Sequence, residues 1–263
     1  MWRLLHTPPA MGAENMALDE ALMQRARETG EWTLRVYSWS QPTLSLGRNQ
    51  IARDGYALAV LAGRGVDVVR RPTGGRAILH HREATYSVTA PVALAGELRE
   101  SYVRINRLLI TALRELGVHA VVAGESDTRR AQTDGAPAQP GLLPCFHHPS
   151  TGEIMAAGRK LAGSAQWRCD GALLQHGSIL IDDDQMQLAS LMKQPAPPIP
   201  RPATLRELIG RAPDVHEVAH ALFAAVRSQE DPAACPLDLD SALAERTKAL
   251  LCRYLDAGWT WRR

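Results

Sequence analysis

The chain has 263 residues, of which 45% are apolar, so it can bury a sizeable core as one large α/β domain or two small ones. A formal charge of +2 and a pI near 8.4 are too mild to indicate a protein that binds nucleic acid or a membrane. No apolar run reaches the ~20 residues that span a bilayer, and the first twenty residues lack the apolar segment of a secretory signal. We therefore expect a cytoplasmic protein with soluble partners.

The first ninety residues are predicted to form a helix at 13–27, strands at 33–39 and 43–46, and a short helix at 56–62. Three further strands are expected at 66–70, 77–81 and 85–89. The clearest helix spans 97–116, where leucine and isoleucine recur every three or four residues until Gly117. A strand at 118–122 follows it.

Residues 124–144 have no periodicity and many turn-forming residues, and a loop of this length is usually functional or disordered. Strands predicted at 153–157, 160–167 and 172–181 have glycines between them, which is typical of an antiparallel set. After residue 184 the pattern changes to helices, with amphipathic ones at 214–229 and 239–256. Strands with flanking helices predict an α/β fold whose central sheet is mixed and largely antiparallel.

Two residues in the stretch 144–180 carry possible chemistry. Cys145 ends the long irregular loop, where reactive residues tend to lie, although a lone cysteine is most often a small buried hydrophobic residue. Lys160 is one of only three lysines among 30 basic residues, which suggests that an amine is needed there. It is either held beside the thiol or the reacting carbonyl, or it is an ordinary solvated lysine in a turn. A neighbouring ammonium group would lower the pKa of a thiol below about 8.5 and raise its thiolate fraction.

The other three cysteines have no such surroundings, and none of the four forms a C-x-x-C pair. The sequence therefore predicts neither a zinc site nor a redox-active pair, and we expect no metal. The acidic run 182–184 is more typical of a solvated helix start than of a metal cluster. His176 could offer a catalytic imidazole, but a buried, hydrogen-bonded histidine is the commoner role.

The segment RRPTGGRAILHH, residues 70–81, has two interpretations. Consecutive glycines let backbone N–H groups approach an oxyanion or phosphate, and a plain hairpin turn explains the same residues equally well. The segment matches neither nucleotide-binding glycine motif, so it predicts no nucleotide site by itself.

Several segments together resemble the lipoate and biotin protein ligase superfamily. They are ENMALDEAL (14–22), LRVYSWSQPTLSLGRNQ (34–50), RRPTGGRAILHHREATYSV (70–88), PCFHHPS (144–150), GRKLAGSAQ (158–166) and LLQHGSIL (173–180). Within the superfamily the chain is most similar to the cysteine-dependent octanoyltransferases that act on lipoyl domains. The resemblance implies a single catalytic domain over 1–263, with a core at about 10–185 and a helical segment at about 186–263.

Three features favour a transferase over an ATP-dependent lipoate ligase. Two glycines rather than three follow the Arg-Arg pair, EATYS at 83–87 has the transferase form, and the cysteine and lysine have the transferase spacing. The sequence also departs from the family at two positions. Aspartate is usual where His81 stands and an aromatic residue where Gly152 stands, which puts in doubt the local hydrogen bonding and the conformation of the cysteine loop.

The resemblance assigns roles residue by residue. Cys145 would accept the acyl group, and Lys160 would lower the pKa of the thiol and steer the acyl carbonyl. The acyl slot would be lined by Arg71, Gly74, Gly75, His80, Gly163, Ser164 and Ala165.

The implied reaction moves octanoyl from octanoyl-acyl carrier protein through an acyl-cysteine thioester to the acceptor lysine of a lipoyl domain, without a cofactor. The expected acceptors are the glycine cleavage H protein or 2-oxoacid dehydrogenase E2 subunits. The alternatives are an ATP-dependent lipoate ligase, an amidotransferase between lipoyl domains, and a non-catalytic acyl-binding or lipoyl-domain-binding protein.

Overall fold

The computed structural model describes residues 1–124, 152–194 and 200–263. Its strands are β1 (Trp2–His6), β2 (Trp32–Tyr37), β3 (Thr43–Leu46), β4 (Asp67–Arg70), β5 (Ile78–His80), β6 (Glu83–Pro91), β7 (Ala120–Val122), β8 (Ile154–Ala156), β9 (Arg159–Cys169), β10 (Ala172–Leu180) and β11 (Cys235–Pro236). Its helices are α1 (Gly12–Thr29), α2 (Leu58–Gly63), α3 (Val92–Ala95), α4 (Leu98–Glu115), α6 (Leu205–Ile209), α7 (Val215–Gln229), α8 (Ser241–Leu255) and α9 (Ala257–Thr260), with a 3₁₀ helix η1 (Gln185–Leu191).

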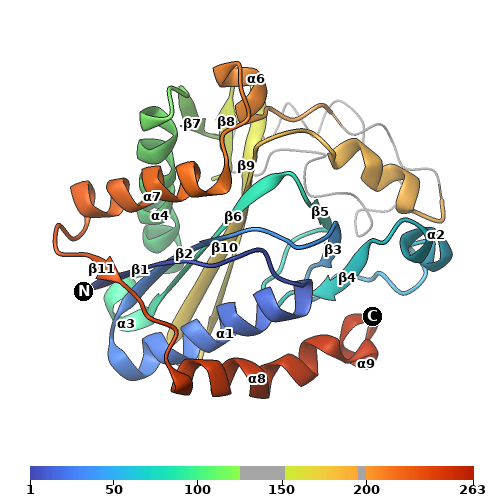
Figure 1. The fold of residues 1–263 in the computed structure, drawn as a ribbon, viewed down its shortest axis with the longest axis horizontal. Coiled ribbons are helices and arrows are strands. Elements are labelled where there is room, and N and C mark those ends of the chain that lie inside the picture. The colour runs from blue at the N-terminus through green and yellow to red at the C-terminus, as the bar shows by residue number, and fades with distance from the viewer. Residues whose placement is uncertain (125–151, 195–199) are drawn as a thin grey trace.

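Two sheets form the framework. The larger has eight strands in the order β11-β1-β2-β6-β10-β9-β8-β7, in which β1 is parallel to its neighbours and the pairs from β2 through β6, β10, β9 and β8 to β7 are antiparallel. Helices α1 and α8 cover one face and α4 and α7 the other (Figure 1). The predicted mixed, largely antiparallel α/β fold is confirmed.

The long helices form because their ends and faces are locally encoded. In α4 the Glu100 carboxylate accepts a hydrogen bond from the backbone N–H of Glu97, which satisfies one of the donors left unpaired at a helix start. Its buried face includes Ile105, Leu109 and Leu113, whose spacing matches one side of a helix. These residues pack into the core cluster that contains Val88 and Leu222.

The smaller sheet has the order β4-β3-β5, with β4 parallel and β5 antiparallel to β3. Because β3 lies between them, β4 and β5 are not a hairpin, and the hairpin interpretation of the Gly-Gly turn is wrong. The turn instead carries the chain across the end of β3, where the larger and smaller sheets meet (Figure 1).

Candidate active site

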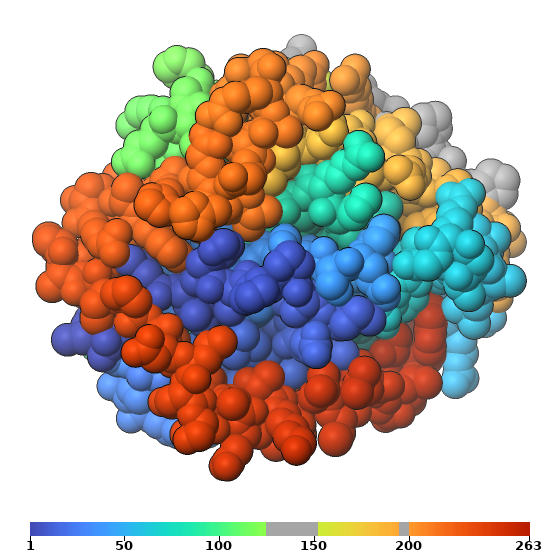
Figure 2. Space-filling model, viewed as in Figure 1, coloured from blue at the N-terminus to red at the C-terminus, as the bar shows by residue number. Residues whose placement is uncertain are grey.

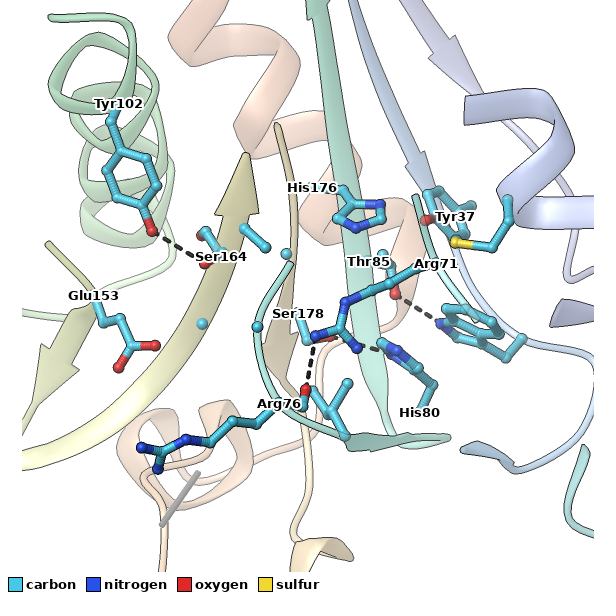
Figure 3. Close-up of a pocket in the computed structure, with 17 residues that line it drawn as sticks. Tyr37, Arg71, Arg76, His80, Thr85, Tyr102, Glu153, Ser164, His176 and Ser178 are labelled. Carbon is cyan, nitrogen blue, oxygen red and sulfur yellow. Dashed lines mark hydrogen bonds between the residues drawn. The ribbon is translucent and has the colours of Figure 1, made fainter. Parts of the chain in front are cut away.

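A cavity of ≈ 210 Å³ lies where the two sheets meet (Figure 3). Strands β9 and β10 form one wall, the turn after Arg71 closes a second side, and α1, β2 and the segment after β2 contribute Met16, Tyr37 and Trp39. The described lining is Met16, Tyr37, Trp39, Arg71, Gly75, Arg76, Ile78, His80, Thr85, Tyr102, Glu153, Gly163, Ser164, Ala165, His176, Gly177 and Ser178.

Six of the seven residues expected to form the acyl slot are part of this lining, and the seventh, Gly74, lies beside it. The Arg71 guanidinium donates to the carbonyls of Gly74 at 2.9 Å and Arg76 at 2.7 Å, so it holds the turn in place. Gly75 has φ +91°, and its carbonyl lies where a side chain on Gly47 would begin, 1.9 Å from an ideal Cβ. Gly47 is therefore needed because the two backbone segments touch here, and Gly75 is needed because L side chains rarely adopt its positive φ.

His80 is buried in a hydrogen-bond chain under the pocket. Its Nε2 lies 2.7 Å from Ser45 Oγ and its Nδ1 2.7 Å from Glu83 Oε1. The ring also stacks on Trp39, with centroids 4.0 Å apart. Burial raises the pKa of Glu83, but the His80 ring and hydroxyl donors outweigh it and lower that pKa overall. His80 is therefore positioned as a rigid part of the wall.

A second buried network is centred on Asp19 of α1. Its carboxylate accepts from Arg35 Nη1 at 2.8 Å and from Tyr37 Oη at 2.9 Å, and lies 3.1 Å from His176 Nδ1. Burial opposes the charge of Asp19, but the Arg35 guanidinium and the His176 ring together lower its pKa. Burial lowers the pKa of His176, whose other nitrogen lies 2.6 Å from Thr73 Oγ1. The expected role of His176 as a buried, hydrogen-bonded histidine agrees with this geometry.

Lys160 is buried, and its Nζ donates to Glu153 Oε1 at 2.6 Å. The pairing of β8 with β9 shifts by one residue between Ile154 and Met155, which is a β-bulge. Leu161 and Ala162 both lie in the core cluster beneath α4, so the bulge turns Lys160 to the opposite face, the face of the pocket. Glu153 lines the cavity (Figure 3), so the ammonium group of Lys160 contacts the pocket wall through this carboxylate.

Cys145 lies outside the described residues, and so does most of the loop that carries it. Cys169, Cys235 and Cys252 are free thiols, and none of them lines the cavity. Cys169 is on β9 near the neighbouring Asp170, and burial followed by this carboxylate raises the pKa of its thiol. That shift opposes thiolate formation, in agreement with the expectation that Cys169 is a bystander.

Four important lining residues were not singled out from the sequence: Trp39, Tyr102, Glu153 and Ser178. The Tyr102 hydroxyl donates to the backbone carbonyl of Ser164, which ties α4 to the pocket wall. Tyr102 is also one of the residues in the apolar spacing of α4, and that spacing concealed its position at the pocket. The acidic Glu153 at the start of a predicted strand was a signal that could have suggested a partner for Lys160.

Both departures from the family pattern have a structural explanation. The carboxylate of Asp184 lies 3.2 Å from His81 Nδ1, so another segment supplies the acid that the family usually has at position 81. The acidic run does precede a helix, η1, as predicted, but Asp184 is buried, so the expectation that this helix start is solvated is wrong for Asp184. Gly152 has φ +93°, and a Cβ there would lie 3.1 Å from the Tyr102 ring. The Tyr102 ring of α4 thus lies against position 152, and the positive φ there favours glycine over an aromatic residue.

Within the described ranges, no group of three or more His, Cys, Asp or Glu side chains is arranged to hold a metal ion. In the same part of the chain no helix is both long and apolar enough to cross a membrane. The described part of the site consists of the cavity, the buried Lys160–Glu153 ion pair, and the two polar networks around Asp19 and Glu83 that hold the cavity walls.

The chain belongs to the family of lipoyl protein ligase A/B catalytic domains, whose model matches residues 11–227. It is 38% identical to an octanoyltransferase LipM of Kyrpidia tusciae over 276 residues, which covers 100% of this chain and 99% of the relative. A protein of the same name from Moorella thermoacetica is 37% identical and covers 100% of this chain and 98% of its own length.

Solved structures share the fold at lower identity. A putative lipoate protein ligase of Thermoplasma acidophilum superposes with a TM-score of 0.77 at 21% identity, and the match covers 99% of both chains. A lipoate-protein ligase A bound with ATP gives a TM-score of 0.73 at 21% identity, over 99% of this chain and 97% of the other. At such identities the likeness concerns the fold alone.

Proposed function

We propose that this protein transfers octanoyl groups to the acceptor lysine of lipoyl domains, with Cys145 as the covalent carrier and octanoyl-acyl carrier protein as the donor. Octanoyl transfer follows from the full-length relatives, which are octanoyltransferases. The observation that carries the site assignment is the buried Lys160–Glu153 pair, which the bulge in β9 turns toward the cavity. The proposed location is the cytoplasm, where the thiol stays reduced.

The reaction has two balanced steps. The Cys145 thiolate attacks the thioester carbonyl, a new C–S bond forms, and the thiolate of the carrier leaves. The neutral amine of the acceptor lysine then attacks the acyl-cysteine, the amide forms, the thiolate of Cys145 leaves, and the amine loses a proton. Exchange of one thioester for another is nearly balanced and amide formation is downhill, so ATP and a cofactor are not needed.

Lys160 is proposed to favour the thiolate by its charge and to attract the carbonyl oxygen of the acyl group. Glu153 holds the ammonium at 2.6 Å and so fixes its position at the wall. The proposed acceptors are the glycine cleavage H protein or 2-oxoacid dehydrogenase E2 subunits. A ligase with this fold from Thermoplasma acidophilum has been solved as part of a lipoylation system with its E2 lipoyl domain.

Mass spectrometry tests the covalent step. The protein is mixed with octanoyl-acyl carrier protein without ATP, and we expect one octanoyl adduct that hydroxylamine removes. The adduct should be absent in Cys145→Ala and present in Cys252→Ala, a control that removes an exposed free thiol. Transfer that occurs only with free octanoate and ATP would show that the protein is a ligase instead.

Substitutions that remove or keep the positive charge of Lys160 test its proposed role. We expect Lys160→Met to lower kcat and to move the rising limb of the pH–rate profile to higher pH, because the thiol loses a neighbouring cation. Lys160→Arg keeps the charge and should keep the wild-type limb even if kcat falls. An unchanged limb in Lys160→Met would contradict the proposed role.

A further inference from the structure

Arginines that are far apart in the sequence gather at one corner of the molecule. We name Arg48, Arg70, Arg262 and Arg263 the arginine cluster. Arg262 Nη2 donates to the carbonyl of Arg48 at 2.6 Å, and Arg70 Nη1 donates to the carbonyl of Gly47 at 2.6 Å. The carbonyl of Arg263 accepts from two backbone N–H groups of the segment that follows β3. In Figure 2 the red C-terminal segment borders the cyan segment around α2.

The described Asp and Glu side chains do not pair with the arginine cluster. In the described part of the chain no Asp or Glu side chain forms an ion pair with any of its four members, while many other arginines have one. Burial lowers the pKa of Arg70 to about 10, and the nearby cations Arg262 and Arg263 contribute to the shift. Burial and then Arg48 and Arg263 lower the pKa of Arg262. Mutual repulsion of this kind weakens when an anion binds.

The arginine cluster begins at the edge of the cavity. The backbone N–H of Arg48 donates to the carbonyl of Thr73, in the turn that closes the pocket, at 2.8 Å. Its guanidinium lies over the ring of Trp167, 4.8 Å from the centroid. Trp167 and the pocket residue Ala165 are two positions apart on β9, so they share a face of the strand. A molecule that reaches from Arg48 toward Ala165 therefore enters the cavity.

The guanidinium groups of Arg48, Arg70 and Arg262 are held in place before any partner binds. Arg262 stacks on the ring of Trp259 at 3.8 Å from the centroid, and the indole N–H of Trp259 donates to the carbonyl of Arg70 at 2.8 Å. Arg70 is fully buried, whereas Arg262 and Arg263 are exposed. Because Arg262 is both exposed and held by these contacts, it loses little side-chain entropy when it binds a carboxylate or phosphate.

We propose that the accessible members of the arginine cluster, Arg48, Arg262 and Arg263, form the docking surface for the acidic protein that carries the acyl group, whose thioester arm then enters the cavity. The inference rests on the proposed function, because it assigns a surface to the donor of that reaction. A protein partner fits better than nucleic acid, because the net charge is only +2 and the cluster is a single local patch rather than a long basic track. Its position beside the pocket places the carrier where its acyl group is needed.

The test reverses the exposed charges. In the variant Arg262→Glu with Arg263→Glu, the Kd for octanoyl-acyl carrier protein, measured by calorimetry, should rise at least about tenfold at low salt, with less difference at high salt. The KM for this donor should rise similarly, whereas kcat/KM for the small neutral donor octanoyl-N-acetylcysteamine should stay at the wild-type value. Thermal unfolding verifies that both proteins fold.

The matched control is Arg107→Glu with Arg114→Glu, two exposed arginines of α4, which changes the net charge equally. It should leave Kd and KM unchanged. Equal losses with both donors, equal effects of the two charge reversals, or equally tight binding of a single-stranded oligonucleotide would each overturn the inference. If the wild type transfers octanoyl from neither donor, the proposed function fails, while calorimetry with the carrier still decides whether the surface exists.

Discussion

Removing the charge of Asp19 is the perturbation with the largest expected effect on stability. The carboxylate accepts from Arg35, Tyr37 and Ser87 at 2.7 to 2.9 Å, and both Asp19 and Arg35 are almost completely buried. In Asp19→Asn the side-chain volume is kept, but the Arg35 guanidinium becomes a buried charge without a counterion. Breaking a buried ion pair on one side typically costs about 3 to 5 kcal/mol. This is a large share of the roughly 5 to 15 kcal/mol that stabilises most domains.

Urea unfolding followed by tryptophan fluorescence measures the loss, with Asp238→Asn as the control. Asp238 is exposed, so its substitution should change the free energy of unfolding by no more than about 0.5 kcal/mol. Octanoyl transfer should also fall in Asp19→Asn, because His176 in the pocket wall lies 3.1 Å from the altered group. A cost below about 1 kcal/mol at neutral pH would refute the argument that Asp19 neutralises Arg35.

The pH dependence gives a second check on the same pair. The pKa of Asp19 is lower in the folded protein than its ordinary value of 3.8, so its stabilising effect is fully present above pH 3.8. The effect is lost as the pH falls through the folded pKa. We therefore expect the difference between wild type and Asp19→Asn to be constant from about pH 5 to 8 and to shrink in acid.

Two other predictions concern single positions. Burial and then the charge of Glu83 raise the pKa of Asp184 to about 6, so the folded state holds this proton more tightly and stability is lost as the pH rises from 3.8 to about 6. Urea titrations should show that this loss, on the order of 3 kcal/mol, is absent in Asp184→Asn. At Gly47 an added Cβ would lie 1.9 Å from the carbonyl oxygen of Gly75. Gly47→Ala should therefore destabilise the protein by about 1 to 3 kcal/mol and reduce octanoyl transfer, whereas Gly63→Ala, with open space around it, should do neither.

The two networks under the pocket explain why a cavity can persist in this fold. Asp19 fixes the side of α1 and β10 through Arg35 and His176, and Glu83 fixes the smaller sheet through His80. Asp19 uses both carboxylate oxygens and Glu83 uses Oε1 to accept several hydrogen bonds within the protein, so the groups around them keep one arrangement. The cavity walls then stay in place while the acyl chain enters and leaves.

The sequence by itself determined the elements whose signals are local. The spacing of apolar residues predicted α4, and the glycines between the predicted strands identified β8, β9 and β10 as an antiparallel set. It did not predict β1 or β11, because β1 is a short strand without alternation and β11 has only two residues. The proposed domain boundaries at about residues 10 and 185 stay predictions.

Only the tertiary structure decided which groups share a site. The sequence identified Lys160 as a candidate. The direction of its side chain depends on the bulge in β9, and its contact with Glu153 depends on the pairing of β8 with β9. Likewise Arg48 and Arg262 meet only because the C-terminal segment packs beside β3 and β4. Periodicity records which face of an element is buried, whereas these contacts depend on strand order and register, which join residues far apart in the chain.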